Sequence, residues 1–170
     1  MRVLFLSLAL LTLVSFDSLK YEKSDEKQRV NETLDAWHKS AADANAKVYF
    51  GMMTDDAIFI GTDAMENWDL KAFQAFAKPY FDRGKAWDFK AIERHIYFDK
   101  SGKLAWFDEL LNTQMKICRG SGVLIKIGKE WKIRHYVLSM TIPNEKADEV
   151  VKIKEGMEDI VIKNLQLKKQ

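Results

Sequence analysis

One acidic residue lies in the middle of an otherwise uncharged stripe. The odd-numbered positions from Ala105 to Ile117 are apolar or uncharged, except for Glu109. If this segment is a strand, alternate side chains share one face, and the carboxylate then lies among buried neighbours. A buried carboxylate must be paired, or must stay neutral with a raised pKa. Glu109 is therefore the first candidate for a functional site.

The pairing of the next two strands brings three polar side chains to the same face. A three-residue connection before Trp131 sets Arg119 opposite Ser139 and keeps the β-branched residues together on one side. In this register His135 shares the inward face with both. Arg119 is then the natural ion-pair partner of Glu109.

These residues allow two uses. Glu109 and Arg119 can form a structural ion pair below a binding pocket that turns nothing over. Alternatively, Glu109 and His135 can transfer a proton beside a carbonyl group. Glu93 adds an open question: a five-residue connection before Leu104 would place it opposite Glu109, and a four-residue connection would not.

Several classes of site are not indicated by the sequence. The three histidines, His38, His95 and His135, form no metal-binding pair at short spacing, so no metal and no cofactor are expected. His38, beside Trp37, is expected at the surface. The net charge of +2 includes no basic block, which argues against nucleic acid. Cys118 is the single cysteine and cannot form an internal disulfide.

Two hydrophobic patterns predict the elements that hold these residues. Apolar residues at three- and four-residue steps predict a helix from Asp25 to Phe50, and a second helix begins at Asp69 and ends at Pro79 and Gly84. A short buried strand at 57–61 lies between them. Period-two runs then predict antiparallel strands at Trp87–Phe98, Leu104–Ile117, Arg119–Ile127 and Trp131–Ile142. The alternation slips near Ala91, which indicates a bulge or bend.

Both ends of the chain carry separate signals. Residues 1–16 combine a basic start with an apolar run too short to span a membrane, which predicts a signal peptide with an uncertain cleavage site and an exported protein, periplasmic or secreted. An uncleaved N-terminal anchor is the alternative. Removal of the signal peptide leaves no expected transmembrane span, and residues 17–30 form a polar lead-in. After Pro143, residues 144–170 predict an amphipathic helix that packs on the domain or on a second subunit.

Several separated motifs, in order, make residues 31–143 similar to a known family. They are Thr54–Asp63, Glu66–Trp68, Ala105–Glu109, Arg119–Leu124 and Glu130–Ser139. Together they resemble the SnoaL-like branch of the nuclear transport factor 2 superfamily. The branch often reads His-Tyr-His-x-Ser at the end of the last strand, where this chain has Val137 in place of the second histidine.

The resemblance implies an α+β fold in which a cone-shaped, strongly curved antiparallel sheet wraps around N-terminal helices, with the C-terminal helix added. Its pocket would be lined by Tyr49, Phe59 and Trp68, with Asp63 and Glu66 at the rim. Because members include binding proteins, isomerases, dehydratases and association domains, the fold does not give the function.

We expect a module that binds a small apolar or carboxylated molecule, anchored by Arg119 and Ser139, as a homodimer. An enzyme using Glu109 and His135, and an oligomerisation module, are the alternatives.

Overall fold

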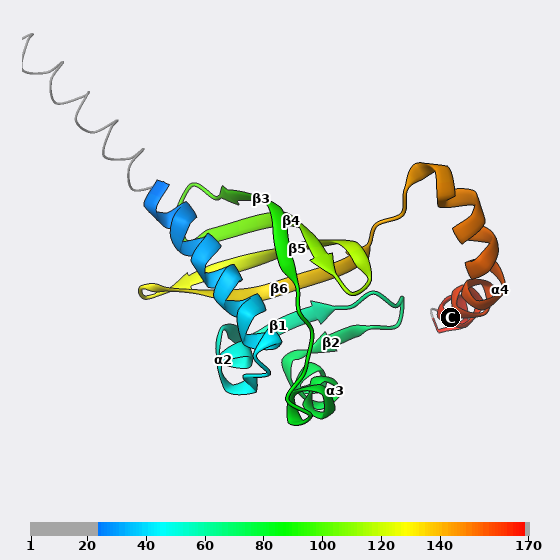
Figure 1. The fold of residues 1–170 in the computed structure, drawn as a ribbon, viewed down its shortest axis with the longest axis horizontal. Helices are drawn as coiled ribbons and strands as arrows, with labels where there is room; N and C mark the ends of the chain where they lie inside the picture. Colours follow the sequence, from blue (N-terminus) through cyan, green and yellow to red (C-terminus); the bar gives the residue numbers. More distant parts are fainter. Residues whose placement is uncertain (1–23, 169–170) are drawn as a thin grey trace, which may run out of the picture. The chain divides into compact units, whose positions relative to one another are not determined.

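The structure, a computed structural model, describes residues 24–168, and the predicted signal peptide lies outside them. The expected α+β class is confirmed: one curved six-stranded sheet carries helices (Figure 1). The first helix is described over 24–42. It is followed by α2 (Ala46–Gly51), β1 (Met53–Ile60), β2 (Asn67–Asp69), α3 (Leu70–Asp82), β3 (Lys90–Phe98), β4 (Leu104–Thr113), β5 (Lys116–Ile127), β6 (Glu130–Met140), a 3-10 turn (Asn144–Lys146) and α4 (Ala147–Leu167).

The strand order across the sheet is β2-β1-β6-β5-β4-β3. Neighbouring strands are antiparallel, except that β1 runs parallel to β6, with Ile58 beside His135. An antiparallel sheet had been expected, and the β1–β6 pair is the exception to it. This one parallel pair joins the early part of the chain to the last strand, and Ile133 N donates to Met52 O at 2.9 Å beside it.

A break divides the helix that was predicted from Asp25 to Phe50. Ala44 has a positive φ of 52°, and the Asn45 side chain accepts from Val48 N to begin α2. A left-handed residue cannot continue a helix, so the hydrophobic stripe changes direction here. Tyr49 is buried after the break, whereas Val48 is exposed.

Two bulges set which side chains face the helices. The first, in β3 between Ala91 and Glu93, confirms the slip seen in the sequence. The second lies in β6, where Ile133 and His135 pair with consecutive residues of β5 and Arg134 is the extra residue. The connection before Glu130 has two residues, so the expected three-residue connection is wrong. The bulge restores the expected pairing from His135 onward.

The remaining boundaries differ from the predictions only locally. Asp69 caps α3 through a 2.8 Å bond from Ala72 N, as expected. Pro79, however, lies inside α3, and Gly84, at φ 71°, follows its end. Strand β4 ends at Thr113, earlier than predicted, because the chain turns there and Lys116 adopts a φ of 68°.

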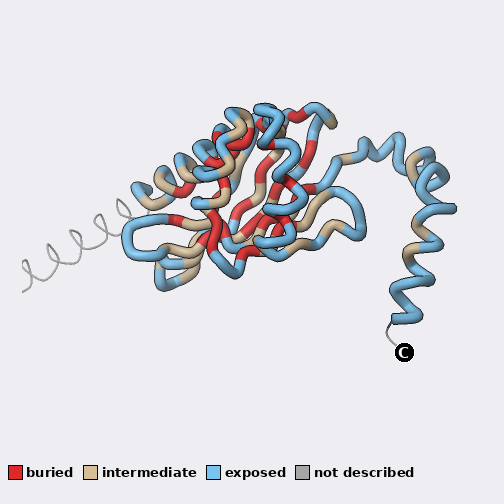
Figure 2. Tube along the Cα trace, turned by 90° about the horizontal axis from the view of Figure 1, so that it is seen from below, coloured by how far each residue is buried: buried red, intermediate tan, exposed pale blue. Residues whose placement is uncertain are grey.

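Aromatic side chains fill the space between the sheet and the helices. The buried positions of the helices and strands gather there (Figure 2). Trp37 stacks on Tyr49 with ring centroids 4.8 Å apart, and Phe59 stacks on Phe73 at 3.9 Å. Burial of such rings contributes most of the stability that a domain without a disulfide requires.

The chain divides into two compact units after Met140. The first holds the sheet with its helices. The second consists of the 3-10 turn and α4, whose side chains are almost all exposed.

Candidate functional site

Glu109 is the centre of the buried polar cluster and is 1% exposed. Its Oε1 accepts hydrogen bonds from His38 Nε2 at 2.8 Å and from the Tyr136 hydroxyl at 3.1 Å. Its Oε2 accepts from Arg94 Nε at 2.8 Å, and Arg94 Nη2 lies at the same distance. An acid, a guanidinium and an imidazole do meet inside the sheet, as the sequence suggested, but two of the three are other residues.

The register of β3 against β4 selects the guanidinium. Arg94 pairs with Glu109, and Glu93 pairs with Leu110, so the two acids do not face each other. Arg94 also reaches the first helix, donating from Nη1 to Asp35 Oδ1 at 2.8 Å and to the backbone oxygen of Asn31 at 3.3 Å. One side chain therefore ties the strand to the helix and balances the buried charge.

The first helix supplies the imidazole, because its buried stripe turns His38 inward beside Trp37. His38 is 4% exposed, so its expected place at the surface is wrong. The histidine follows a fully buried tryptophan and lies four residues after Leu34, which is a core position. That spacing was the signal in the sequence that could have identified it.

The buried cluster requires glycine at position 120. A Cβ there would overlap the Tyr136 hydroxyl and lie 2.9 Å from Glu109 Oε1. Gly120 pairs directly with Glu109 across β4 and β5. The absence of a side chain at Gly120 therefore allows Glu109 and Tyr136 to approach this strand closely.

Arg119 and His135 do not join Glu109. Arg119 pairs with Leu110 and is exposed, because alternation along β5 turns it to the opposite face of the sheet. His135 is half-buried on that same outer face, since the Arg134 bulge inverts the alternation and sends Tyr136 inward. Ser139 pairs with Arg119, as expected, but both are exposed. The predicted Glu109–Arg119 ion pair is therefore wrong.

The aromatic candidates belong to the packed interior or its edge. Tyr49 is fully buried and contacts Trp37, and Phe59 is buried against Phe73. Trp68 is half-buried and stacks on Phe76 at 4.3 Å. These rings fill the hollow that the sequence had assigned to a ligand.

Asp63 and Glu66 hold the loop between β1 and β2. Glu66 Oε2 accepts from Asp63 N at 3.1 Å, and Asp63 Oδ1 accepts from Met65 N at 2.8 Å. Gly61 N closes the loop by donating to Glu66 O at 2.9 Å. The structure therefore shows both acids holding the loop between the two strands.

Electrostatics keep Glu109 ionised. Burial alone would raise its pKa, but the hydrogen bond from His38 and the charges of His38 and Arg94 outweigh that cost and lower the pKa below the ordinary 4.5. Burial, followed by the nearby Glu109 carboxylate, raises the pKa of Tyr136 well above its ordinary value. Tyr136 therefore stays a neutral donor, and Glu109 stays an acceptor.

His38 also lies in the wall of a pocket, which we call the His38 pocket. Its volume is about 340 Å³, and it lies between the first helix and the start of β3. The lining residues are Asp35, His38, Lys39, Ala42, Asp43, Asp88, Phe89, Lys90 and Ala91. The Nδ1 atom of His38 is buried and has no hydrogen-bond partner among the described residues. An unpaired buried polar atom is uncommon and needs an explanation.

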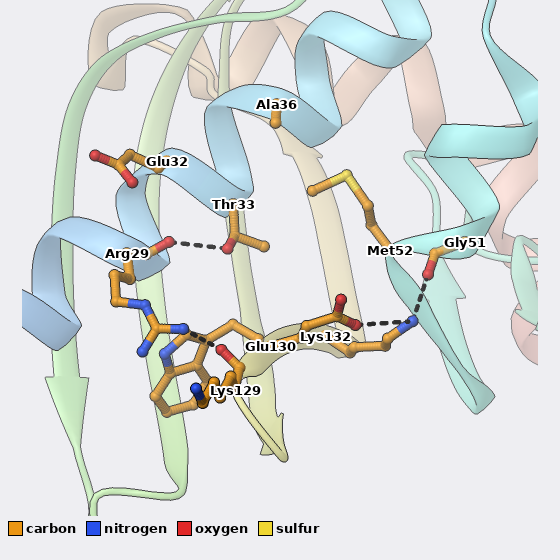
Figure 3. A pocket seen from close by; sticks show the side chains of 10 residues that line it. Arg29, Glu32, Thr33, Ala36, Gly51, Met52, Lys129, Glu130 and Lys132 are labelled. Atoms are coloured by element: carbon orange, nitrogen blue, oxygen red, sulfur yellow. Dashed lines mark hydrogen bonds and ion pairs between the residues drawn. The ribbon is translucent and has the colours of Figure 1, made fainter.

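A second pocket, of about 520 Å³, lies where the first helix meets the end of α2 and the β5–β6 hairpin (Figure 3). Two of its cationic side chains already have partners. Lys132 Nζ donates to Gly51 O at 2.7 Å, and Arg29 Nη2 donates to Lys129 O. We find no unpaired buried polar atom among the residues that line it. It therefore offers a ligand fewer unsatisfied contacts than the His38 pocket does.

The described part of the chain shows neither a metal-binding cluster nor a membrane-spanning helix. Across residues 24–168, no three side chains of the kinds that bind metals come close enough to hold an ion. Over the same range, no helix combines the length and apolar character needed to cross a membrane.

Comparison with known proteins agrees with the fold. A protein of unknown function from Pseudomonas putida, described as NTF2-like, matches with a TM-score of 0.59 at 14% identity, over 72% of this chain and 91% of its own. A putative scytalone dehydratase from Novosphingobium aromaticivorans matches with a TM-score of 0.60 at 9% identity, over 72% and 89%. At such identities the likeness shows the fold alone.

No curated protein is similar enough to the chain to be matched. The family comparison is decisive for the fold, because the model of the SnoaL-like domain matches residues 30–143, which is most of the chain. The chain therefore belongs to the SnoaL-like domain family, within the NTF2-like fold.

Proposed function

We propose that this domain binds a small neutral molecule carrying a hydroxyl group in the His38 pocket. One observation carries the proposal: a buried imidazole lines a pocket, and one of its nitrogens is bound to a carboxylate while the other has no hydrogen-bond partner among the described residues. The volume of about 340 Å³ falls within the range of pockets that hold small ligands.

The protonation pattern of His38 favours a hydroxyl group. Ionised Glu109 can only accept, so Nε2 of His38 carries the proton of their hydrogen bond. Nδ1 then accepts if the ring is neutral and donates if it is protonated. A hydroxyl group can both donate and accept, so it satisfies Nδ1 in either state.

The charges around the pocket favour a neutral ligand. Lys39 pairs with Asp43 at 2.7 Å, and Lys90 lies 3.6 Å from Asp88. Asp35 is paired with Arg94. Each charged residue at the rim thus has a partner of opposite sign, so the pocket offers no free charge to a carboxylate or an ammonium group.

The first test identifies the ligand and its site together. Native mass spectrometry of protein purified from its source would show a co-purifying molecule as an added mass. We expect His38→Phe to lose that mass and His95→Phe to keep it, because His95 lies on the surface and contacts Asp108 instead. Equal occupancy in both variants would exclude His38 as a ligand contact.

A second test uses known probes. Phenol and its methyl ether, anisole, have nearly the same shape, but only phenol has a hydroxyl group. We expect phenol to move the ¹⁵N resonance of His38 Nδ1 and to bind about tenfold more tightly than anisole, which is the worth of one hydrogen bond. Equal binding, or shifts only at His95 and His135, would contradict the proposal.

Proton transfer is the second candidate, and it now rests on His38 and not on His135. A carboxylate that orients an imidazole at 2.8 Å is an arrangement that general bases use. One structural neighbour is named a putative scytalone dehydratase, although its likeness shows the fold alone. If the identified ligand exchanges a carbon-bound proton in D₂O with wild-type protein but not with His38→Gln, the domain is an enzyme.

A further inference from the structure

Helix α4 carries an apolar surface that nothing in its own unit covers. Ile153, Met157 and Ile160 are each more than 60% exposed. The helix has 21 residues, so it is about 31 Å long. An isolated helix of this length is marginally stable in water. A partner is therefore needed to cover the apolar side chains.

The spacing of these residues is that of a coiled coil. Starting at Val150, six residues on one side of the helix follow one another at alternating steps of three and four residues, over three heptads. They are Val150, Ile153, Met157, Ile160, Asn164 and Leu167. A strict alternation of this kind occupies the a and d positions of a heptad, and it forms a narrow seam against one similar helix.

The polar member of the seam indicates how the helices are arranged. Asn164 occupies an a position, where asparagine specifies register and oligomeric state at some cost in stability. In a parallel, in-register pair, it meets the same asparagine of the second copy. In an antiparallel pair of the same length it would face Ile153, and its amide would be buried without a partner.

The flanking charges agree with the parallel arrangement. Glu149 occupies a g position, and Lys154 occupies the e position five residues later. In a parallel pair, Glu149 of one copy would face Lys154 of the second copy, and the reverse. Both side chains also form intrahelical pairs, Lys146–Glu149 at 2.7 Å and Lys154–Glu158 at 2.9 Å. The contact between copies therefore selects orientation more than it adds affinity.

A lipid surface fits this helix less well. Its polar face has five acidic residues against three lysines, so an anionic membrane would repel it. Three exposed apolar residues, Val151, Ile162 and Leu165, lie outside the seam at b and f positions. They provide a matched control, because a membrane would use them and a two-stranded seam would not.

We infer that α4 pairs with α4 of a second copy as a parallel, two-stranded coiled coil, which makes the protein a dimer. The inference is independent of the proposed ligand site. It rests on the heptad seam, Asn164 and the complementary e and g charges.

The test compares two isoleucines that lie two residues apart. Light scattering on the full chain at micromolar concentrations should give twice the monomer mass. Ile160→Glu, in the seam, should weaken association at least 100-fold, and Ile162→Glu, outside it, should change association less than about threefold. A monomeric wild type, or equal effects of the two variants, would overturn the inference.

A disulfide reports the arrangement directly. Leu167→Cys occupies a d position at the end of α4, so oxidation should link two copies of a parallel pair. In an antiparallel pair the two thiols would lie at opposite ends of the helices and would remain free. The wild-type chain is the control, because its one cysteine, Cys118, is buried. A dimer in which Leu167→Cys fails to cross-link would contradict the parallel pairing of α4.

Asn164→Val keeps the test informative if charged variants fail to fold. An apolar residue at this position should strengthen association and allow species larger than a dimer. A helix that packs on its own domain, or on lipid, would show no such change in mass, and that result would contradict the inference.

Discussion

At the scale of single residues, the contacts of Glu109 suit it to hold neighbouring side chains in place. Its two oxygens accept bonds from His38, Arg94 and Tyr136, and its pKa is lowered. A carboxylate is poorly suited as a general base at neutral pH when hydrogen-bond donors occupy both of its oxygens and its pKa is lowered. His38 differs, because its Nδ1 is buried and has no hydrogen-bond partner among the described residues.

The charge on Glu109 should appear in the acid stability of the domain. Because its folded-state pKa lies below 4.5, ionised Glu109 stabilises the fold above that value, and the contribution is lost as the pH falls through the folded-state pKa. Glu109→Gln removes the buried charged partner of Arg94 and leaves it the exposed Asp35, so we expect the free energy of unfolding at neutral pH to fall by about 3 kcal/mol. Denaturant unfolding measures both effects.

The same experiment contains its control. Between about pH 5 and pH 3, wild-type stability should fall more steeply than that of Glu109→Gln. Glu93→Gln, one strand away and exposed, should change stability by less than about 0.5 kcal/mol at neutral pH. Parallel acid profiles for wild type and Glu109→Gln would show that Glu109 is not ionised in the fold.

Gly120 should be intolerant of a methyl group because of its two neighbours. We expect Gly120→Ala to destabilise the domain by about 1–3 kcal/mol, since the new Cβ overlaps the Tyr136 hydroxyl. Tyr136→Phe removes that oxygen. The double variant should therefore be more stable than the sum of the single effects predicts, as measured by a double-mutant cycle from chemical denaturation. Strict additivity would mean that the overlap is relieved in another way.

At the scale of elements, the sequence predicted the order of strands and helices well, because each has a strong hydrophobic period. It also predicted the cap at Asp69 and the bulge near Ala91. The bulge at Arg134 has the same kind of signal: Trp131 and Ile133 are apolar at odd positions, and Tyr136 and Leu138 at even ones. The predicted register kept the β-branched residues together as one unbroken alternation, which concealed that slip and assigned His135 to the wrong face.

The partners of Glu109 were harder to predict, because they depend on tertiary contacts. Arg94 is opposite Glu109 only in one of several possible registers of β3, and nothing local selects that register. His38 comes from a different element, 71 residues earlier in the chain. The acid was found from the pattern of one strand, whereas its imidazole and guanidinium required the packed structure.

The break after the first helix can be tested with two glycine substitutions that should change the stability of the domain in opposite directions. Ala44 adopts φ 52°, a conformation that costs a non-glycine residue about 1–2 kcal/mol. Ala44→Gly should therefore stabilise the domain by about 0.5–1 kcal/mol, after glycine's own entropic cost. Ala36→Gly, inside the helix, should destabilise it by about 1 kcal/mol. Thermal unfolding distinguishes the two, and destabilisation by both variants would contradict the left-handed conformation.

At the scale of the whole molecule, the domain depends on its packed core. The single cysteine, Cys118, is buried and next to Thr113, so no disulfide reinforces the fold. Its stability must therefore come from the aromatic interior and from the links that join the first helix to the sheet, above all Arg94 and His38. Such a protein can work in an oxidising or a reducing compartment without a change in its covalent structure.

We propose that this compartment lies outside the cytoplasm, because the apolar run of residues 3–16 has the length and basic start of a secretion signal. Protein recovered from the source should lack at least residues 1–16 by intact mass and should retain one free thiol. Leu8→Arg interrupts the apolar run, so it should leave the protein uncleaved inside the cell. A chain that begins at Asp17 should stay in the cytoplasm. Its circular dichroism spectrum should equal that of the exported protein, since the SnoaL-like domain begins at residue 30. Full-length protein with Met1 intact in the exported fraction would contradict cleavage, and full-length protein found only in the cytoplasm would contradict export.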